Sequence, residues 1–205
     1  MAAAAVVAAL AALLVCLAVP RAPAAPVGAA QACGLERWSV KTLSDSRAGR
    51  VDLRSRTTSV LALTRRARPM VGTNTPRLAA ETVSYRVRAK LVEARGEDDG
   101  DIHLVLAEPR DPSVTMIAEL PSSNCLGRSR PAGRRRMVAA RRAFEARCGY
   151  VSQHWHRLGG NATLSGVLFF DLKHGQTGLA PNGAELHPLL SFRSDHCAVR
   201  SPAPA

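Results

Sequence analysis

The chain has 205 residues and a formal net charge of +12, with 28 Lys and Arg against 16 Asp and Glu, and only 4% of its residues are aromatic. This length fits one domain of ordinary size rather than several. The positive charge is typical of proteins that attract nucleic acid, anionic cell-wall polymer or lipid headgroups. Since Lys41, Lys90 and Lys173 are the only lysines, the charge can equally reflect an arginine-rich genome and a well-solvated surface.

Residues 1–25 form a predicted signal peptide. An unbroken apolar run over 6–19 precedes Pro20 and the small-residue sequence Ala22-Pro23-Ala24, which is typical of a cleavage site. The run is shorter than the roughly 20 residues of a membrane-spanning helix, and no later segment is apolar enough to span a membrane. We therefore expect a secreted, periplasmic or cell-envelope protein. A second candidate cleavage site, Ala30-Gln31-Ala32, would leave Cys33 at the mature N-terminus.

The mature chain divides into an N-terminal arm over 26–80, a β-rich domain over 81–197 and a tail over 198–205 that we expect to be disordered. The first half of the arm shows no clear periodicity. Thr57-Thr58-Ser59 then predicts the cap of a short helix that ends at Arg65-Arg66, where cations favour the helix dipole. Pro69 stops this helix.

Three predicted strands follow the arm. Apolar and polar residues alternate over 82–91, which indicates a half-buried strand with one basic face. The acidic turn Glu97-Asp98-Asp99-Gly100 leads to a second strand over 101–107, and a Pro-Arg-Asp-Pro turn leads to a third over 114–120.

A predicted amphipathic basic helix over 134–147 precedes two more strands, over 163–171 and 185–192. Three strands, a helix and two strands is the order of the five-stranded oligonucleotide- and oligosaccharide-binding (OB) barrel. We therefore predict a mainly β (α+β) fold with a five-stranded OB-like barrel and a helix between its third and fourth strands. A generic α+β sandwich is the alternative. In such barrels the first and fourth inter-strand loops flank a ligand groove across the second and third strands.

The alternation of side chains between the two faces of a strand predicts a cluster of titratable groups. If the second and third strands pair with their apolar residues facing one core, Asp101 and His103 share the opposite face with Glu119. In the fifth strand, Leu186, Leu190 and Phe192 are expected to point inward, which sends Glu185 and His187 outward. A barrel pairs the third strand with the fifth, so Glu119 is expected to meet His187.

Histidines and carboxylates in such a group suit general acid–base chemistry or the binding of a divalent metal. The candidate catalytic residues are Asp101, His103, Glu119, Glu185 and His187. The candidate ligands of a divalent metal, the only cofactor that the sequence suggests, are Asp101, His103, Glu119 and His187. The alternative is that these side chains form solvated cross-strand pairs without a site.

Two further groups are candidate ligand-binding residues. His174, Gln176 and Asn182 lie on a glycine-rich loop, where they either grip a ligand or bond the loop backbone. Arg134, Arg135 and Arg136 form a dense basic run that either contacts phosphates or begins a solvated helix. Aromatic residues for stacking on nucleic acid bases are scarce.

Four cysteines remain after the signal peptide, namely Cys33, Cys125, Cys148 and Cys197. An even number of thiols in an exported chain, with no Cys-x-x-Cys spacing, favours two disulfides over a metal site. Three pairings are possible.

The chain resembles a family of small secreted bacterial proteins. The resemblance is carried by residues 171–192, which contain the signature HGQTGxAPNxxELHPxL, and extends to the segment CGLERWSVK at 33–41 and to residues 97–125. Because it takes in Cys33 and Cys125 but neither of the other two cysteines, the resemblance implies that Cys33 pairs with Cys125 and Cys148 with Cys197. It implies no particular activity.

Together these features favour an exported OB-like binding module for an anionic polymer, such as nucleic acid, or for a nucleotide-like ligand. The alternative is a metal-assisted phosphodiester hydrolase, since the barrel class includes secreted nucleases and the chain combines acidic residues with arginines. A structural envelope protein is the third possibility. Because no glycine-rich phosphate loop, nucleophile elbow or His-Glu-x-x-His motif is present, the sequence leaves open whether the protein is an enzyme, and it does not specify an oligomeric state.

Overall fold

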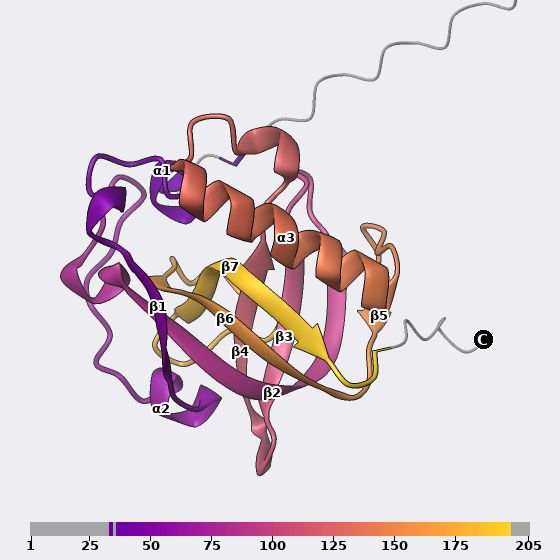
Figure 1. Cartoon of the computed structure of the whole chain (residues 1–205). Coiled ribbons are helices and arrows are strands. Elements are labelled where there is room, and N and C mark those ends of the chain that lie inside the picture. Colours follow the sequence, from indigo (N-terminus) through magenta and orange to yellow (C-terminus); the bar gives the residue numbers. More distant parts are fainter. Residues whose placement is uncertain (1–32, 35, 198–205) are drawn as a thin grey trace, which may run out of the picture.

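The computed structural model describes residues 33–34 and 36–197, so the predicted signal peptide and C-terminal tail lie outside the described residues. The fold is mainly β, with one mixed seven-stranded sheet and a few helices (Figure 1). The helices are α1 (Trp38–Lys41), α2 (Val60–Thr64) and α3 (Pro131–Cys148), with short 3-10 turns at Ala48–Arg50, Ala79–Thr82 and Ser123–Cys125. The strands are β1 (Asp52–Thr57), β2 (Val83–Gly96), β3 (Ile102–Glu108), β4 (Asp111–Leu120), β5 (His156–Arg157), β6 (Asn161–Phe170) and β7 (Ala184–Ser194).

Five of the strands close into a ring. β2, β3 and β4 form an antiparallel meander, β4 then pairs in parallel with β7, and β7 pairs antiparallel with β6. β6 returns to the first half of β2, at Ser84 to Lys90, which closes the ring. β1 adds to β2 in parallel, and the short β5 also pairs with β2. The order of the five ring strands and the position of α3 between β4 and β6 agree with the sequence prediction.

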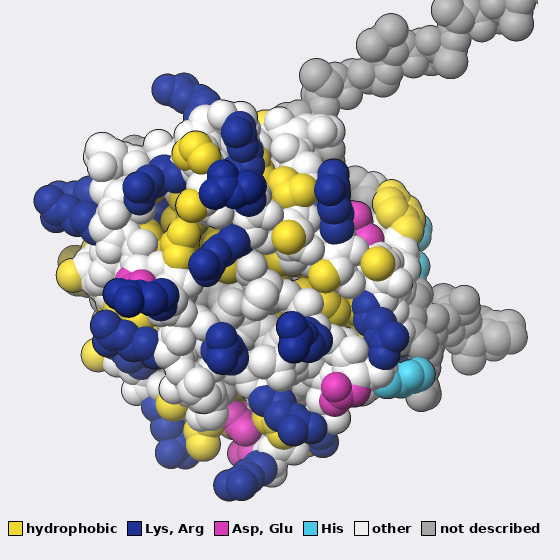
Figure 2. Space-filling view, in the orientation of Figure 1, with side chains coloured by type: hydrophobic (Ala, Val, Ile, Leu, Met, Phe, Trp, Pro, Cys, Tyr) yellow, Lys and Arg dark blue, Asp and Glu magenta, His cyan; other side chains and the backbone are white. Residues whose placement is uncertain are grey.

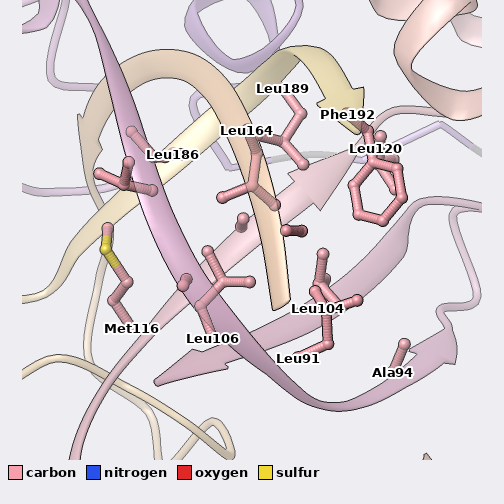
Figure 3. Packing of buried hydrophobic residues seen from close by; sticks show 14 of the residues in the cluster. Leu91, Ala94, Leu104, Leu106, Met116, Leu120, Leu164, Leu186, Leu189 and Phe192 are labelled. Carbon is pink, nitrogen blue, oxygen red and sulfur yellow. The ribbon is translucent and has the colours of Figure 1, made fainter. Parts of the chain in front are cut away.

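The ring encloses the main hydrophobic core. Figure 3 shows Leu104, Leu106, Met116, Leu164 and Leu186 converging from four strands, and each is fully buried. They come from alternate positions of their strands, as expected for side chains on one face. Removal of this apolar surface from water, at roughly 25 cal/mol per Å², is the main force that holds the ring together.

The helix α3 packs mainly against β7 and joins two cores. Its buried residues recur at helical spacing, and Phe144 contacts Phe192 of the main core edge-on, with ring centroids 5.3 Å apart. Met137, nearer the start of the helix, enters a second cluster with Leu43, Val167 and Leu190. The N-terminal arm is therefore packed on the outside of the ring, where it shares a core with α3.

The prediction for Leu190 is wrong. Along β7 the register shifts twice against β6, between Ser165↔Ser191 and Gly166↔Leu189 and again between Gly166↔Leu189 and Leu168↔Leu186, and each shift adds one residue of β7. Such a bulge interrupts the alternation of the strand. Leu189 therefore faces the main core, and Leu190 points out of the ring toward α3.

The strand β1 is absent from the sequence prediction, because its sequence DLRSRT has no alternating apolar pattern. It is held by its pairing with β2 and by the hydrogen bond that Ser84 Oγ donates to the carbonyl of Asp52, 2.6 Å long. The predicted short helix does occur, with Ser59 accepting a hydrogen bond from the amide of Ala62 at its start.

Two disulfides tie the ends of the described chain to the turn after β4 and to α3. Cys33 is bonded to Cys125, and Cys148 at the end of α3 is bonded to Cys197. These are the pairs that the family resemblance implied. Among the described residues, no helix is long and apolar enough to cross a membrane.

Candidate functional site

The five titratable residues expected to share a face do lie together, on the outer face of β3, β4 and β7. His103 of β3 is the register partner of Glu119 of β4. β4 and β7 pair at Ile117↔Glu185 and Ala118↔Leu186, which brings Glu119 beside His187. Asp101 lies directly before β3. The strand register alone thus gathers these residues, because alternation sends all of them away from the core.

Glu119 lies at the centre of this group. Its Oε1 is 3.6 Å from His103 Nδ1, and its Oε2 is 3.1 Å from His187 Nδ1. The other ring nitrogen of His187 lies 3.7 Å from Asp101 Oδ2, and Glu185 Oε2 lies 3.9 Å from His187 Nδ1. We call Asp101, Glu119, Glu185 and His187 the acidic cluster.

The acidic cluster is buried, with Glu119 the most exposed of its members at 6%. The loop after β6 covers it from one side, where the Thr177 carbonyl lies 2.9 Å from His103 Nε2. Gly178 of the same loop lies so close to β3 that an added Cβ would be 2.6 Å from a methyl carbon of Val105. An open ligand groove across β3 and β4, expected from the barrel class, is therefore wrong, and so is the alternative of solvated cross-strand pairs.

Three neighbours of the cluster were not among the predicted site residues. Lys41, at the end of α1, places its Nζ 3.3 Å from Asp171 Oδ2. Glu97 of the acidic turn lies 3.4 Å from His103 Nδ1. Lys41, Glu97 and Asp171 all lie in segments that carry the family resemblance. Nothing in the spacing of these residues, however, predicts which strand face they lie against.

Burial shifts the protonation of every member of the acidic cluster. It raises the pKa of Glu119 to about 7, although nearby Lys41 opposes the shift. Burial and the neighbouring carboxylates also raise the pKa of Asp101 and of Glu185 well above their usual ranges. The pKa of His187 falls well below its ordinary value because burial, followed by the charges of Lys41 and His103, disfavours the imidazolium.

Stability should therefore depend on pH when cations are removed by a chelator. A carboxyl whose pKa is raised on folding stabilises the fold below its unfolded pKa, near 4.5 for Glu119, and this contribution is lost as the pH rises toward 7. The lowered pKa of His187 makes the fold less stable as the pH falls below 6.5, which opposes the effect of the carboxyls. It is one group, however, whereas three carboxyls have raised pKa values. We expect the free energy of unfolding in urea to fall from pH 5 to pH 7, and Glu119→Gln to flatten this dependence. A stability that rises over this range in the unmodified protein would contradict the expectation.

Several buried polar atoms of the cluster lack a hydrogen-bond partner within the described part of the chain. They are Asp101 Oδ2, both carboxylate oxygens of Glu185 and both ring nitrogens of His187. His187 Nδ1 is close to Glu119, but the geometry of that contact is not that of a hydrogen bond. One ligand atom each of Asp101, Glu119 and His187 lies within 4.8 Å of the others, a spacing that can hold a metal ion. A second such group joins Glu97 and His103 to Glu119.

The predicted loop residues mostly bond backbone groups, within the loop and at neighbouring α2. Asn182 donates to the carbonyls of Leu63 and Arg66 and accepts from the amide of Ala184, so its amide group ties the loop to α2. Gln176 donates to the Leu172 carbonyl and contacts the ring of exposed His174, 2.9 Å away. The structure thus gives both amides the backbone-holding role, which was one of the two that the sequence allowed.

The predicted basic run lies apart from the acidic cluster. Arg134, Arg135 and Arg136 are exposed in the first turns of α3. Arg134 donates to the carbonyl of Gly127, and Arg136 to the carbonyl of Leu53 in β1. None of these contacts involves the cluster, so the acidic and basic candidates do not form one site.

A second group of arginines was not among the predicted site residues. Arg86 of β2 and Arg193 of β7 line a surface pocket of about 420 Å³ together with Thr163, Ser191 and Phe192. The sequence carries a signal for it, since the polar face of the first predicted strand was recognised as basic. Which strands lie beside that face is decided by the closure of the ring.

No protein-family model matches the chain, and no curated protein matches it. One solved structure, of a "putative aspartyl-tRNA synthetase" from Leishmania major Friedlin, is similar over 76% of this chain with 13% sequence identity and a TM-score of 0.38. This chain spans only 23% of that protein. A similarity of this size identifies neither a family nor a function.

Proposed function

We propose that this protein is an exported OB-like module that binds an anionic polymer, and that the polymer binds on the outer face of β2, β6 and β7. An OB-like barrel is supported by the order of the ring strands, by the parallel pairing of β4 with β7 and by the helix between β4 and β6. Export is supported by the two disulfides, which persist in oxidising compartments.

The observation that carries the proposal is the way in which the fold sorts charge. Six acidic side chains are buried, whereas Arg37 and Arg77 are the only buried cations among the described residues. The buried acids are Glu81, Asp101, Glu108, Glu119, Asp171 and Glu185. The solvent-facing surface is consequently more basic than the net charge of +12 suggests, and such a surface attracts polyanions over distances of about a Debye length.

The face we propose for binding combines guanidinium and hydroxyl groups. Arg88, Thr163 and Arg193 are register partners on β2, β6 and β7, so they form a row across the three strands. Arg86, Ser165 and Ser191 form the next row. All but Ser165 are exposed. We call Arg86, Arg88, Thr163, Ser191 and Arg193 the basic sheet face.

The basic sheet face belongs to a broader basic surface. Figure 2 shows Lys and Arg side chains spread over the side of the molecule that carries α3, with few acidic side chains between them. Arg136 of the predicted basic run reaches the backbone of Leu53 in β1, which is the strand next to β2. Guanidinium groups pair well with phosphate or sulfate oxygens, and hydroxyl groups donate to the same oxygens.

The alternative of a phosphodiester hydrolase gains no comparable support. Its acidic residues would have to contact the substrate, yet Asp101, Glu185 and His187 are each at most 1% exposed. The carboxylates would also repel a phosphate. With two Trp and two Tyr in the chain, recognition through the charge of the polymer backbone is favoured over base stacking.

The proposal is tested by measuring how binding depends on salt. We expect the purified protein to bind a fluorescent single-stranded oligonucleotide and inorganic polyphosphate at low salt. The log–log slope of affinity against salt for the oligonucleotide should be about −0.7 for each phosphate contacted. Replacing Arg86, Arg88 and Arg193 by Gln should weaken binding and make the slope smaller by about 2–3.

A matched control removes the same charge from another part of the surface. Arg65, Arg68 and Arg110 are exposed near α2 and the turn between β3 and β4, and their triple replacement by Gln should leave most of the binding intact. Equal losses in the two triple variants would overturn the assignment to the basic sheet face. Failure of the unmodified protein to bind either polyanion at low salt would overturn the function and favour a structural envelope protein.

A further inference from the structure

The acidic cluster holds more negative charge than its neighbours neutralise. Among the described residues, Lys41 forms its ion pair with Asp171, outside the cluster, and of the cluster's members His103 Nδ1 approaches only Glu119, at 3.6 Å. Burying carboxylates without cations is costly, because they lose hydration without gaining a compensating charge. Such a group must either keep protons or hold a positive ion.

The positions of the unpartnered atoms favour an ion. Asp101 Oδ1 accepts a hydrogen bond from the amide of Ser122, 2.8 Å long, which fixes the carboxylate with Oδ2 turned toward His187. That Oδ2, both nitrogens of His187 and both oxygens of Glu185 are buried without hydrogen bonds among the described residues. Buried polar groups are nearly always satisfied in folded proteins, so this concentration of exceptions indicates a missing partner.

From this geometry we infer that Asp101, Glu119 and His187 bind one divalent metal ion, with Glu185 as a further or alternate ligand. Two of these ligands are also contacted by groups that would orient them, as is usual around bound metals. The Ser122 amide donates to Asp101, and His103 approaches the second oxygen of Glu119. One imidazole with carboxylates suits Zn²⁺ or Mn²⁺ better than Mg²⁺ or Ca²⁺, which prefer sites made only of oxygen.

The place of the cluster in the ring indicates what such an ion would do. β4 and β7 are paired only at Ile117↔Glu185 and Ala118↔Leu186, whereas every other pair of neighbouring ring strands has a longer ladder. The proposed ligands come from the start of β3, the end of β4 and the start of β7. An ion there would stabilise this short pairing between β4 and β7. Because the cluster is covered, the site is structural rather than catalytic, and it is independent of the polyanion-binding face.

The test begins with protein that has been stripped by a chelator and desalted with its disulfides intact. Adding Zn²⁺ or Mn²⁺ at a hundredfold excess over its dissociation constant should raise the melting temperature by about 5–10 °C. Elemental analysis after removal of free metal should find close to one ion per chain. Mg²⁺ and Ca²⁺ should give smaller shifts at the same concentration.

Glu119→Gln separates this site from adventitious binding by the exposed histidines. The neutral amide removes repulsion among the carboxylates, so the stripped variant should melt at or above the temperature of the stripped unmodified protein at pH 7. It should nevertheless lose the metal-induced shift. Asp101→Asn should behave in the same way. Glu108→Gln, which changes a buried carboxylate at the far end of β3, should keep the full shift.

Two results would overturn the inference. One is stripped protein that gains no stability from either Zn²⁺ or Mn²⁺, because the cluster would then be satisfied by protons. The other is a full metal-induced shift in Glu119→Gln, which would place the ion elsewhere. The stripped protein should still bind polyphosphate if it remains folded, so failure of the metal site is distinguishable from failure of the proposed function.

Discussion

Glu81→Ala should lower the free energy of unfolding by about 3–5 kcal/mol, because it leaves a buried guanidinium without its counter-charge. Both side chains of the Arg37–Glu81 pair are fully buried, and the two oxygens of Glu81 lie 2.9 Å and 2.6 Å from Nη1 and Nη2 of Arg37. Glu81 also accepts from the amides of Leu78 and Phe170. Urea unfolding under oxidising conditions measures the change.

The exposed pair between Arg54 and Asp52 provides the control. Arg54→Gln should leave the unfolding midpoint unchanged, because the Arg54 side chain is exposed and water screens this ion pair. A loss below about 1 kcal/mol for Glu81→Ala would mean that the site relaxes to admit water. Hydrogen exchange would then be expected to show new solvent exposure near α1.

The Arg37–Glu81 pair also matters for the proposed metal site. The guanidinium of Arg37 lies over the ring of Phe169, 4.6 Å from its centroid. The same ring contacts the imidazole of His187 edge-on, with centroids 5.6 Å apart. Arg37 also donates to the carbonyl of Phe170. The ion pair therefore anchors the segment whose Lys41 reaches the acidic cluster. Weakening it should loosen the cover of the cluster as well as the fold.

Replacing Cys33 and Cys125 together by Ser should cost about 4–5 kcal/mol by the chain-entropy relation, since the bond closes a loop with a sequence separation of 92. The reduced chain has more unfolded conformations, so the unfolded state is favoured. The matched Cys148→Ser and Cys197→Ser variant opens a loop with a separation of 49. It should cost about 0.6 kcal/mol less, the amount expected for a halving of loop length.

Urea midpoints of the two double variants at equal protein concentration give the comparison. A greater loss on opening the shorter loop would show that contacts in the folded state, such as the anchoring of α3 through Cys148, outweigh loop entropy. Peptide mapping of the unmodified protein without reduction should recover the two bonds as linked peptides. Free thiols at all four positions would contradict both the pairing and the expectation of export.

The strand β7 carries residues of both proposed sites. Glu185 and His187 lie at its start, and Ser191 and Arg193 lie near its end. His187 and Arg193 are six residues apart, which in an extended strand is about 20 Å. The proposed metal site and the basic sheet face therefore share the strand β7. They are too far apart for one ligand atom to contact both. Variants at one site should accordingly leave the other unchanged.

Much of this arrangement follows from the sequence alone. Alternation along the strands was sufficient to predict which side chains leave the core together, because a residue's face is set by its parity. His103 and Glu119 on the paired strands β3 and β4, and Glu185 and His187 on β7, share the outer face for that reason. The order of strands around the long helix likewise follows from local patterns. The disulfide pairing, by contrast, was inferred from the family resemblance.

Only the tertiary structure decided which of these faces are covered. Parity does not reveal whether an outward face meets water or another segment, and here the loop at Thr177 closes over His103 of β3 while Lys41 pairs with Asp171 directly after β6. Burial then changes the chemistry, because desolvation raises the pKa of carboxyls that would be ordinary on a surface. The bulge that turns Leu190 outward and the pairing that holds the polar strand β1 depend on neighbours distant in sequence, so no local pattern of residues could have predicted them.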